Sequence, residues 1–181
     1  MTLCVILSEA KDLHMDISII TVTWNSKDKI GEQIRSVQAG CVSASYEQLV
    51  VDNASSDGTG EYIQKEFPEA RFVQNRKNAG FGAANNQAAK DARGEFLLFL
   101  NPDMRVTSGS IDTMLAWMRQ HPKVGLASCL LTTPDGTPHP NAQPRRFPGF
   151  ADQFAIMLKL KQFFQSALNR YLFQDFDPNK E

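Results

Sequence analysis

Asn101, Pro102 and Asp103 are the residues of this sequence that best combine chemical function with a defined position. They directly follow Phe96 to Leu100, a continuous apolar run that predicts a strand buried on both faces of a parallel sheet. Pro102 cannot donate a ladder hydrogen bond, so the strand should end there, with an amide and a carboxylate at its carboxyl end. Ligands bind at that end of the strands in open α/β sheets. Taken alone, the segment is equally compatible with an ordinary Asn-Pro turn.

Two other predicted strands end in polar residues in the same way. The polar residues at the three strand ends are Thr23, Trp24, Asn25, Asp52, Asn53, Ser55, Asp57, Asn101 and Asp103. Because the carboxyl ends of parallel strands lie on one edge of a sheet, we expect these side chains to converge. Carboxylates on one edge suit Mg²⁺ or Mn²⁺, with phosphate completing the coordination shell. No cluster of thiolates or imidazoles indicates zinc.

The segment from Asn78 to Gly82 predicts a glycine-rich turn into an Ala-rich helix. Asn78, Gly80 and Gly82 precede the start of that helix, where exposed N–H groups favour anions. The segment is neither a Walker A loop nor a G-x-G-x-x-G motif. A purely structural turn is the simpler interpretation of this segment by itself.

The hydrophobic pattern predicts an α/β fold, with strands and helices alternating at least four times. The predicted strands cover residues 16–23, 46–51, 71–74, 95–100 and 124–131. The predicted helices cover 29–39, a segment capped by Ser56 or Thr59 that ends at Phe67, 83–92, 110–119 and 149–173. Such alternation is typical of a doubly wound, mostly parallel sheet with right-handed crossovers and flanking helices.

Length and composition set the limits of function. The 181 residues suit one domain, and 42% apolar and 22% charged residues are ordinary values for a globular protein. A formal net charge of −1 gives no field that would favour nucleic acid. The three cysteines are far apart and lack a CxxC pair, so we expect no disulfide framework and a cytoplasmic location, with the inner face of the membrane as the alternative.

The two ends of the chain differ from its centre. Residues 1–14 are interrupted by charges and resemble a disordered or non-native leader, with an extra edge strand from Cys4 to Leu7 as the alternative. Residues 15–148 form the predicted domain, and 149–181 the terminal amphipathic helix and tail. A core-facing helix is the first interpretation; binding to a membrane surface, or to a second copy of the chain as a homodimer, are the alternatives.

Four ordered motifs carry a family resemblance: ITVTWNS, VVDNASSDGT, NAGFGAANN and FLLFLNPDM. Over about residues 15–148 the chain resembles the inverting family 2 glycosyltransferases of the GT-A fold, and within them the rhamnosyltransferase-like branch of cell-surface polysaccharide synthesis. The resemblance implies that Thr23, Trp24, Asn25 and Asp52 lie beside the nucleotide base. It also implies that Asn53 and Asp57 belong to the nucleotide-binding segment, that Asn78 and Gly80 underlie the ribose and phosphates, and that Asn101 and Asp103 occupy the Asp-x-Asp motif. Asp103 would bind Mg²⁺ or Mn²⁺.

The sequence departs from the family pattern in three places. Asn101 stands where the first acid of Asp-x-Asp is expected. Asn85 stands where many relatives carry an arginine that binds phosphate. No acidic motif after Arg146 matches the general base that would activate an acceptor hydroxyl, so the acceptor half is expected to be missing and the catalytic residue is unassigned.

The sequence therefore supports three functional hypotheses. The first is an inverting, metal-assisted glycosyltransferase that uses a dTDP- or UDP-linked sugar and a saccharide or lipid-linked acceptor. The second is a nucleotide-sugar-binding module without turnover of its own. The third is a sugar nucleotidyltransferase, which the absence of glycine from the TWNSKDK segment disfavours.

Overall fold

The computed structural model describes residues 4–7, 15–139 and 153. The chain forms two compact units, one of residues 2–129 and one of residue 1 with 130–181. The predicted terminal helix, and with it the proposed membrane and dimer contacts, lies outside the described residues. Within the described part of the chain, no helix combines the length and apolar character needed to cross a membrane.

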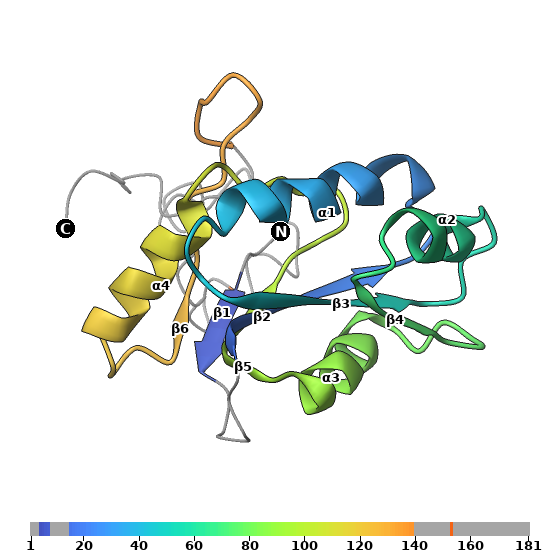
Figure 1. Cartoon of the computed structure of the whole chain (residues 1–181), viewed down its shortest axis with the longest axis horizontal. Helices are drawn as coiled ribbons and strands as arrows, with labels where there is room; N and C mark the ends of the chain where they lie inside the picture. Colours follow the sequence, from blue (N-terminus) through green and yellow to red (C-terminus); the bar gives the residue numbers. More distant parts are fainter. Residues whose placement is uncertain (1–3, 8–14, 140–152, 154–181) are drawn as a thin grey trace. The chain divides into compact units, whose positions relative to one another are not determined.

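The first unit is built on a sheet in which six strands are described, in the order β4-β3-β2-β5-β1-β6 (Figure 1). The strands are β1 (Cys4–Leu7), β2 (Met15–Thr23), β3 (Tyr46–Asp52), β4 (Arg71–Gln74), β5 (Gly94–Phe99) and β6 (Leu126–Ala127). β2, β3, β4 and β5 pair in parallel. β1 pairs antiparallel with both β5 and β6. The predicted α/β class with a mostly parallel sheet is confirmed.

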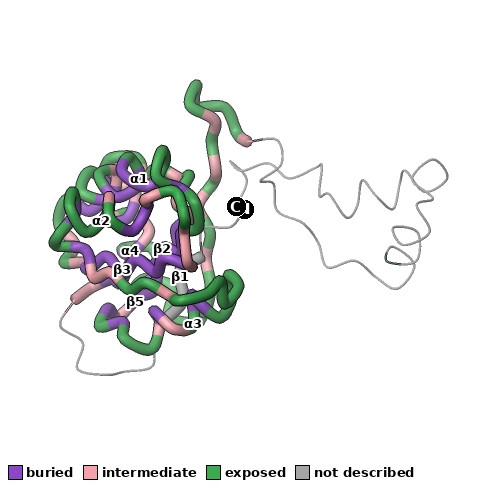
Figure 2. The backbone as a smooth tube through the Cα atoms, turned by 90° about the vertical axis from the view of Figure 1, so that its right-hand side faces the viewer, coloured by how far each residue is buried: buried purple, intermediate pink, exposed green. Residues whose placement is uncertain are grey.

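Helices cover both faces of this sheet. α1 (Lys27–Gly40), α2 (Thr59–Glu66) and α4 (Ser110–Gln120) lie on one face, and α3 (Phe81–Asp91) lies on the other (Figure 1). Alternation along β2 explains the two layers of core, because Ile19 packs under α1 and α4 while Ile20 packs against α3. The sheet is consequently the most buried part of the chain, and the outer helix faces are exposed (Figure 2).

Two sequence predictions about strands need correction. The strand predicted over 124–131 is reduced to the two residues of β6, because only Val5 and Ile6 of β1 pair with it. Leu126 within it is 55% exposed, so its side chain does not hold a longer strand against the core. The alternative strand at Cys4–Leu7 corresponds to β1, but β1 lies between β5 and β6 and is not an edge strand.

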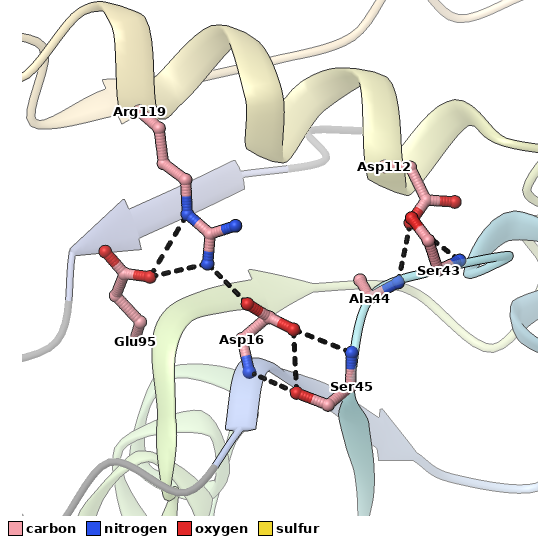
Figure 3. Close-up of polar contacts among 7 residues, drawn as sticks. All are labelled: Asp16, Ser43, Ala44, Ser45, Glu95, Asp112 and Arg119. Carbon is pink, nitrogen blue, oxygen red and sulfur yellow. Dashed lines mark hydrogen bonds and ion pairs between the residues drawn. The ribbon is translucent and has the colours of Figure 1, made fainter.

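Polar contacts tie the elements together at the amino-terminal edge of the sheet (Figure 3). Arg119 of α4 donates to Asp16 at 2.5 Å and to Glu95 at 2.7 Å. Asp16 also accepts hydrogen bonds from the amide and hydroxyl of Ser45, both at 2.7 Å. Asp112 of α4 accepts bonds from the backbone N–H groups of residues 42, 43 and 44. These contacts therefore hold α4 to the starts of β2 and β5 and to the segment before β3.

In the second unit, the described segment 130–139 forms a tight turn. Thr132 and Pro138 form an antiparallel bridge, and the amide of Thr133 donates to the carbonyl of Thr137 at 2.8 Å. Gly136 has a φ of 84°, a left-handed conformation that glycine adopts without strain.

Candidate nucleotide site at the carboxyl edge of the sheet

The strand register brings the polar strand ends together, as expected for parallel strands. Thr23 at the end of β2 is the register partner of Asp52 at the end of β3. On the other side of β2, the amide of Leu100 donates to the carbonyl of Ile20 at 2.9 Å, so Asn101 leaves the sheet beside the same edge. The loops that follow β2, β3 and β4 project from this side of the molecule (Figure 1).

The loops after β2 and β3 are interlocked. The amide of Asn25 donates to the Ser55 hydroxyl at 2.8 Å, and the Ser56 amide donates to the Asn25 side-chain oxygen at 2.8 Å. The amide of Ser26 donates to the Thr59 hydroxyl at 3.1 Å. Asn25 has a φ of 49°, a left-handed conformation that asparagine tolerates better than most residues. These bonds give the two loops a single, defined arrangement.

Asp57 stabilises the starts of two helices at once. Its Oδ1 accepts from the Thr59 amide at 3.0 Å at the start of α2, and its Oδ2 accepts from the Lys27 amide at 3.2 Å at the start of α1. Partial burial acts to raise the pKa of Asp57, but the bonds from Thr59 and Lys27 outweigh it and hold the pKa below its ordinary value. The capping prediction for Ser56 or Thr59 was therefore wrong: Gly58, with a φ of 83°, occupies the cap position, and Asp57 supplies the acceptor.

Asp52 is fully buried at the strand end. Its carboxylate accepts from the amide of Ser55 at 3.0 Å and from the hydroxyl of the same residue at 2.5 Å. Each carboxylate oxygen has a second lone pair, so these two bonds leave acceptor capacity for a ligand N–H. Asp52 is the register partner of Thr23, and its place beside a base stays a prediction.

Asn53 fixes the glycine-rich loop to the end of β3. Its side-chain oxygen accepts from the Asn75 side chain and the Ala79 amide, both at 3.1 Å, and its amide nitrogen donates to Asn78 at 3.0 Å. The Asn53 side chain is only 2% exposed, so these contacts use it for structure. Asn75, which the sequence analysis did not single out, adds a backbone bond to the Asp52 carbonyl at 2.8 Å. The sequence signal that could have identified Asn75 is its position as a polar residue directly after β4.

Asn78 and Gly80 shape the start of α3. The side-chain oxygen of Asn78 accepts from the amide of Gly80 at 2.8 Å. Gly80 has φ 85° and ψ 157°, a conformation essentially restricted to glycine. The first turn of α3 carries no acidic residue, so the positive end of the helix is not neutralised by its own side chains.

Thr23 and Trp24 present the polar and aromatic groups that the site still has available. The Thr23 hydroxyl is fully buried and, within the described residues, is one of two buried side-chain atoms without a hydrogen-bond partner; the other is the Gln33 oxygen. Trp24 directly follows it and is 59% exposed. A buried hydroxyl without a partner costs free energy unless a bound group satisfies it.

Asn101 and Asp103 lie in a turn after β5. The amide of Met104 donates to the carbonyl of Asn101 at 3.1 Å, and the Asp103 side chain is exposed. No group of three His, Cys, Asp or Glu side chains comes together as a metal site among the residues that the structure describes. Asp103 can therefore offer one exposed carboxylate to a divalent ion, and the remaining ligands would have to be water and phosphate oxygens.

The fold and site define the class of protein: an α/β protein with polar strand ends and a glycine-rich loop gathered at the carboxyl edge of a parallel sheet. The model of the family described as "Glycosyl transferase family 2" matches residues 18–177, and the chain belongs to this family. Its fold is the GT-A type found in solved structures of the family.

Curated relatives support this placement. The chain is 31% identical over 106 residues to the N-acetylglucosaminyl-diphospho-decaprenol L-rhamnosyltransferase of Mycobacterium tuberculosis. This match covers 52% of this chain and 34% of that protein. It is 34% identical over 123 residues to the O-antigen biosynthesis protein RfbC of Myxococcus xanthus, covering 67% of this chain and 10% of that protein. The chain thus spans about a third or less of these two relatives.

A solved relative extends the comparison to a structure with nucleotide bound. The S. aureus TarS 1-349 structure in complex with UDP has a TM-score of 0.54 and 28% identity, covering 60% of this chain and 33% of that one. The TarS complex with UDP-GlcNAc gives a TM-score of 0.53 at 29% identity. Both matches support the assignment of the GT-A fold to this chain.

Proposed function

We propose that this chain binds a dTDP- or UDP-linked sugar and takes part in its transfer to a saccharide or lipid-linked acceptor of cell-surface polysaccharide synthesis. One observation carries the proposal: Thr23 and Asp52 are register partners at a strand end where a buried hydroxyl lacks a partner and a carboxylate keeps acceptor capacity. That combination suits the N–H and C=O edge of a pyrimidine. The names of the Mycobacterium tuberculosis relative and the bound UDP of TarS point the same way.

The remaining predicted residues divide between direct contact and support. Trp24 is exposed beside Thr23 and offers an aromatic surface to the base or ribose. Asn78 and Gly80 shape the loop beneath the ribose and phosphates, and Asn25, Asn53 and Asp57 hold the loops in place. Asn101 positions the turn that carries Asp103.

Asp103 would hold the divalent ion, Mg²⁺ or Mn²⁺. When bound, such an ion offsets the negative charge that develops on the departing diphosphate. In an inverting transfer the acceptor oxygen bonds to the anomeric carbon as the bond to the diphosphate breaks, and the acceptor proton passes to a base. We assign that base to no residue of this chain.

Calorimetry with UDP, dTDP and GDP, each with and without Mn²⁺, tests the proposal. We expect tighter binding of the pyrimidine nucleotides and a dependence on Mn²⁺ that Asp103→Asn removes. Asp91→Asn is the matched control, because its carboxylate lies on α3 away from this turn. Lack of binding of every nucleotide would refute the proposal, and retention of full metal dependence in Asp103→Asn would refute the metal assignment.

A second candidate is a nucleotide-sugar-binding module without turnover of its own. It is kept because no residue of this chain is assigned as the base that would activate the acceptor hydroxyl. Donor hydrolysis and transfer assays on the full chain separate the two candidates. Turnover supports the transferase, whereas tight donor binding with no turnover supports the module. The family match sets aside the nucleotidyltransferase alternative.

A further inference from the structure

Arg76 and Lys77 form an adjacent pair of exposed cations on the loop that joins β4 to α3. Neither side chain makes an ion pair with any residue that the structure describes. By contrast, Arg71, Arg105 and Arg119 each contact a carboxylate. The positive charge of the pair is therefore not neutralised within the described part of the chain.

The backbone on both sides of this pair is fixed. Before it, Asn75 is bonded to the Asp52 carbonyl at 2.8 Å and, through its side chain, to Asn53 at 3.1 Å. After it, Asn78 and Ala79 are bonded to the side chain of Asn53 at 3.0 and 3.1 Å. The two cations thus extend from a short segment whose ends are attached to the carboxyl end of β3, on the side of the molecule where the loops after β2 and β3 also project (Figure 1).

The first turn of α3 carries no positively charged side chain. Asn85 stands where an arginine was expected from the family resemblance, and its side-chain nitrogen donates to the carbonyl of Phe81 at 2.9 Å. The Asn85 side chain is nearly buried and turned back onto its own helix. The positive charge closest in sequence to this helix start is therefore the pair of loop cations.

We propose that Arg76 and Lys77 bind the diphosphate of the nucleotide donor, supplying the charge that Asn85 does not. This inference rests on the proposed function and names two further residues of the same site. Arginine and lysine both form charge-assisted hydrogen bonds to phosphate oxygens, and arginine does so with two N–H groups at once. A fixed backbone reduces the entropy lost when the side chains engage the ligand.

The test compares UDP with uridine, which lacks the phosphates, by calorimetry on the full chain. In the double variant Arg76→Ala/Lys77→Ala we expect UDP affinity to fall roughly tenfold while uridine affinity stays unchanged. The difference should shrink at high salt because exposed charges are screened. The matched control is Lys65→Ala/Lys123→Ala, which removes the same charge from exposed positions outside the loops of the carboxyl edge.

Several results would overturn the inference. If wild type binds UDP and the double variant binds it equally well, the loop cations do not contact the diphosphate. An equal loss for uridine would indicate a structural effect instead. A loss of UDP affinity in Lys27→Ala but not in the double variant would place the contact at the start of α1 instead. Failure of wild type to bind UDP would overturn the proposed function as well.

Discussion

The substitution Asp16→Asn tests how much the polar contacts at the amino-terminal edge of the sheet contribute to the free energy of unfolding. Asp16 accepts hydrogen bonds from Arg119 and from both donors of Ser45 (Figure 3). The Arg119 bond, followed by those from Ser45, lowers the pKa of Asp16 from its ordinary 3.8 to about 2. A carboxyl with a depressed pKa stabilises the folded state above its unfolded pKa, and this contribution is lost as pH falls through the folded pKa.

The size of the effect follows from these values. The difference between 3.8 and about 2 corresponds to about 2.5 kcal/mol as an upper bound. The Asp16 and Arg119 side chains are 29% and 45% exposed, so solvent screening reduces the expected contribution to about 1 kcal/mol. Arg119 keeps its contact with Glu95 in the variant, which further limits the loss.

Urea denaturation of wild type and Asp16→Asn at pH 7, 4, 3 and 2 measures this contribution. We expect the variant to be about 1 kcal/mol less stable at pH 7, with the difference disappearing between about pH 4 and pH 2. Comparing the two proteins isolates Asp16 from other carboxyls whose pKa is lowered, such as Asp112. Asp91→Asn, which makes the same change of side chain on α3, is the control. A difference that stays constant down to pH 2 would show that the charge of Asp16 is not the stabilising feature.

Three further predictions concern the sheet and the glycine-rich loop. Gly94→Ala should cost about 3 kcal/mol in urea denaturation, because a Cβ would lie 2.3 Å from the backbone nitrogen of Ser18; Gly82→Ala, where nothing lies within 4 Å, should cost nothing. Glu47→Gln should cost about 2 kcal/mol in the same assay, since it weakens a buried acceptor of Arg71, and an unchanged midpoint would contradict this. Asn53→Ala should release the glycine-rich loop, so limited trypsin digestion should cut after residues 76 and 77 faster than in wild type; equal rates would show that Asn53 does not hold the loop.

Sequence periodicity was sufficient for the parallel part of the fold. β-branched and apolar runs identified β2, β3, β4 and β5 to within one residue. For β2 and β5 the reason is burial on both faces, which leaves a nearly continuous apolar signal. The β6 region failed for the opposite reason. An apolar stretch from Val124 predicts a strand, but strand length there depends on the two residues of β1 that pair with it, which the local sequence does not encode.

The sequence predicted where the candidate site lies. It did not predict which of the site residues make hydrogen bonds within the protein and which remain available to a ligand. Parallel connectivity placed Thr23, Asp52 and Asn101 on one edge. The sequence did not show that Asn53 is used by three hydrogen bonds within the protein. Nor did it show that Ala54 adopts a φ of 64°, since nothing in an alanine signals a left-handed turn. Such features depend on contacts between distant segments.

These internal contacts decide how the site would meet a nucleotide. Asn53 and Asp57 are engaged by the protein itself, so we expect them to act on the proposed nucleotide through the shape of the loops that they hold. Thr23 differs, because its buried hydroxyl has no partner among the described residues and is able to hydrogen-bond a bound group. Holding the loops in advance lowers the entropy lost on binding, and a donor that satisfies the Thr23 hydroxyl removes a standing cost of the folded state. The edge is therefore better suited to a ligand with hydrogen-bonding groups at this depth than to one that contacts only the exposed loops.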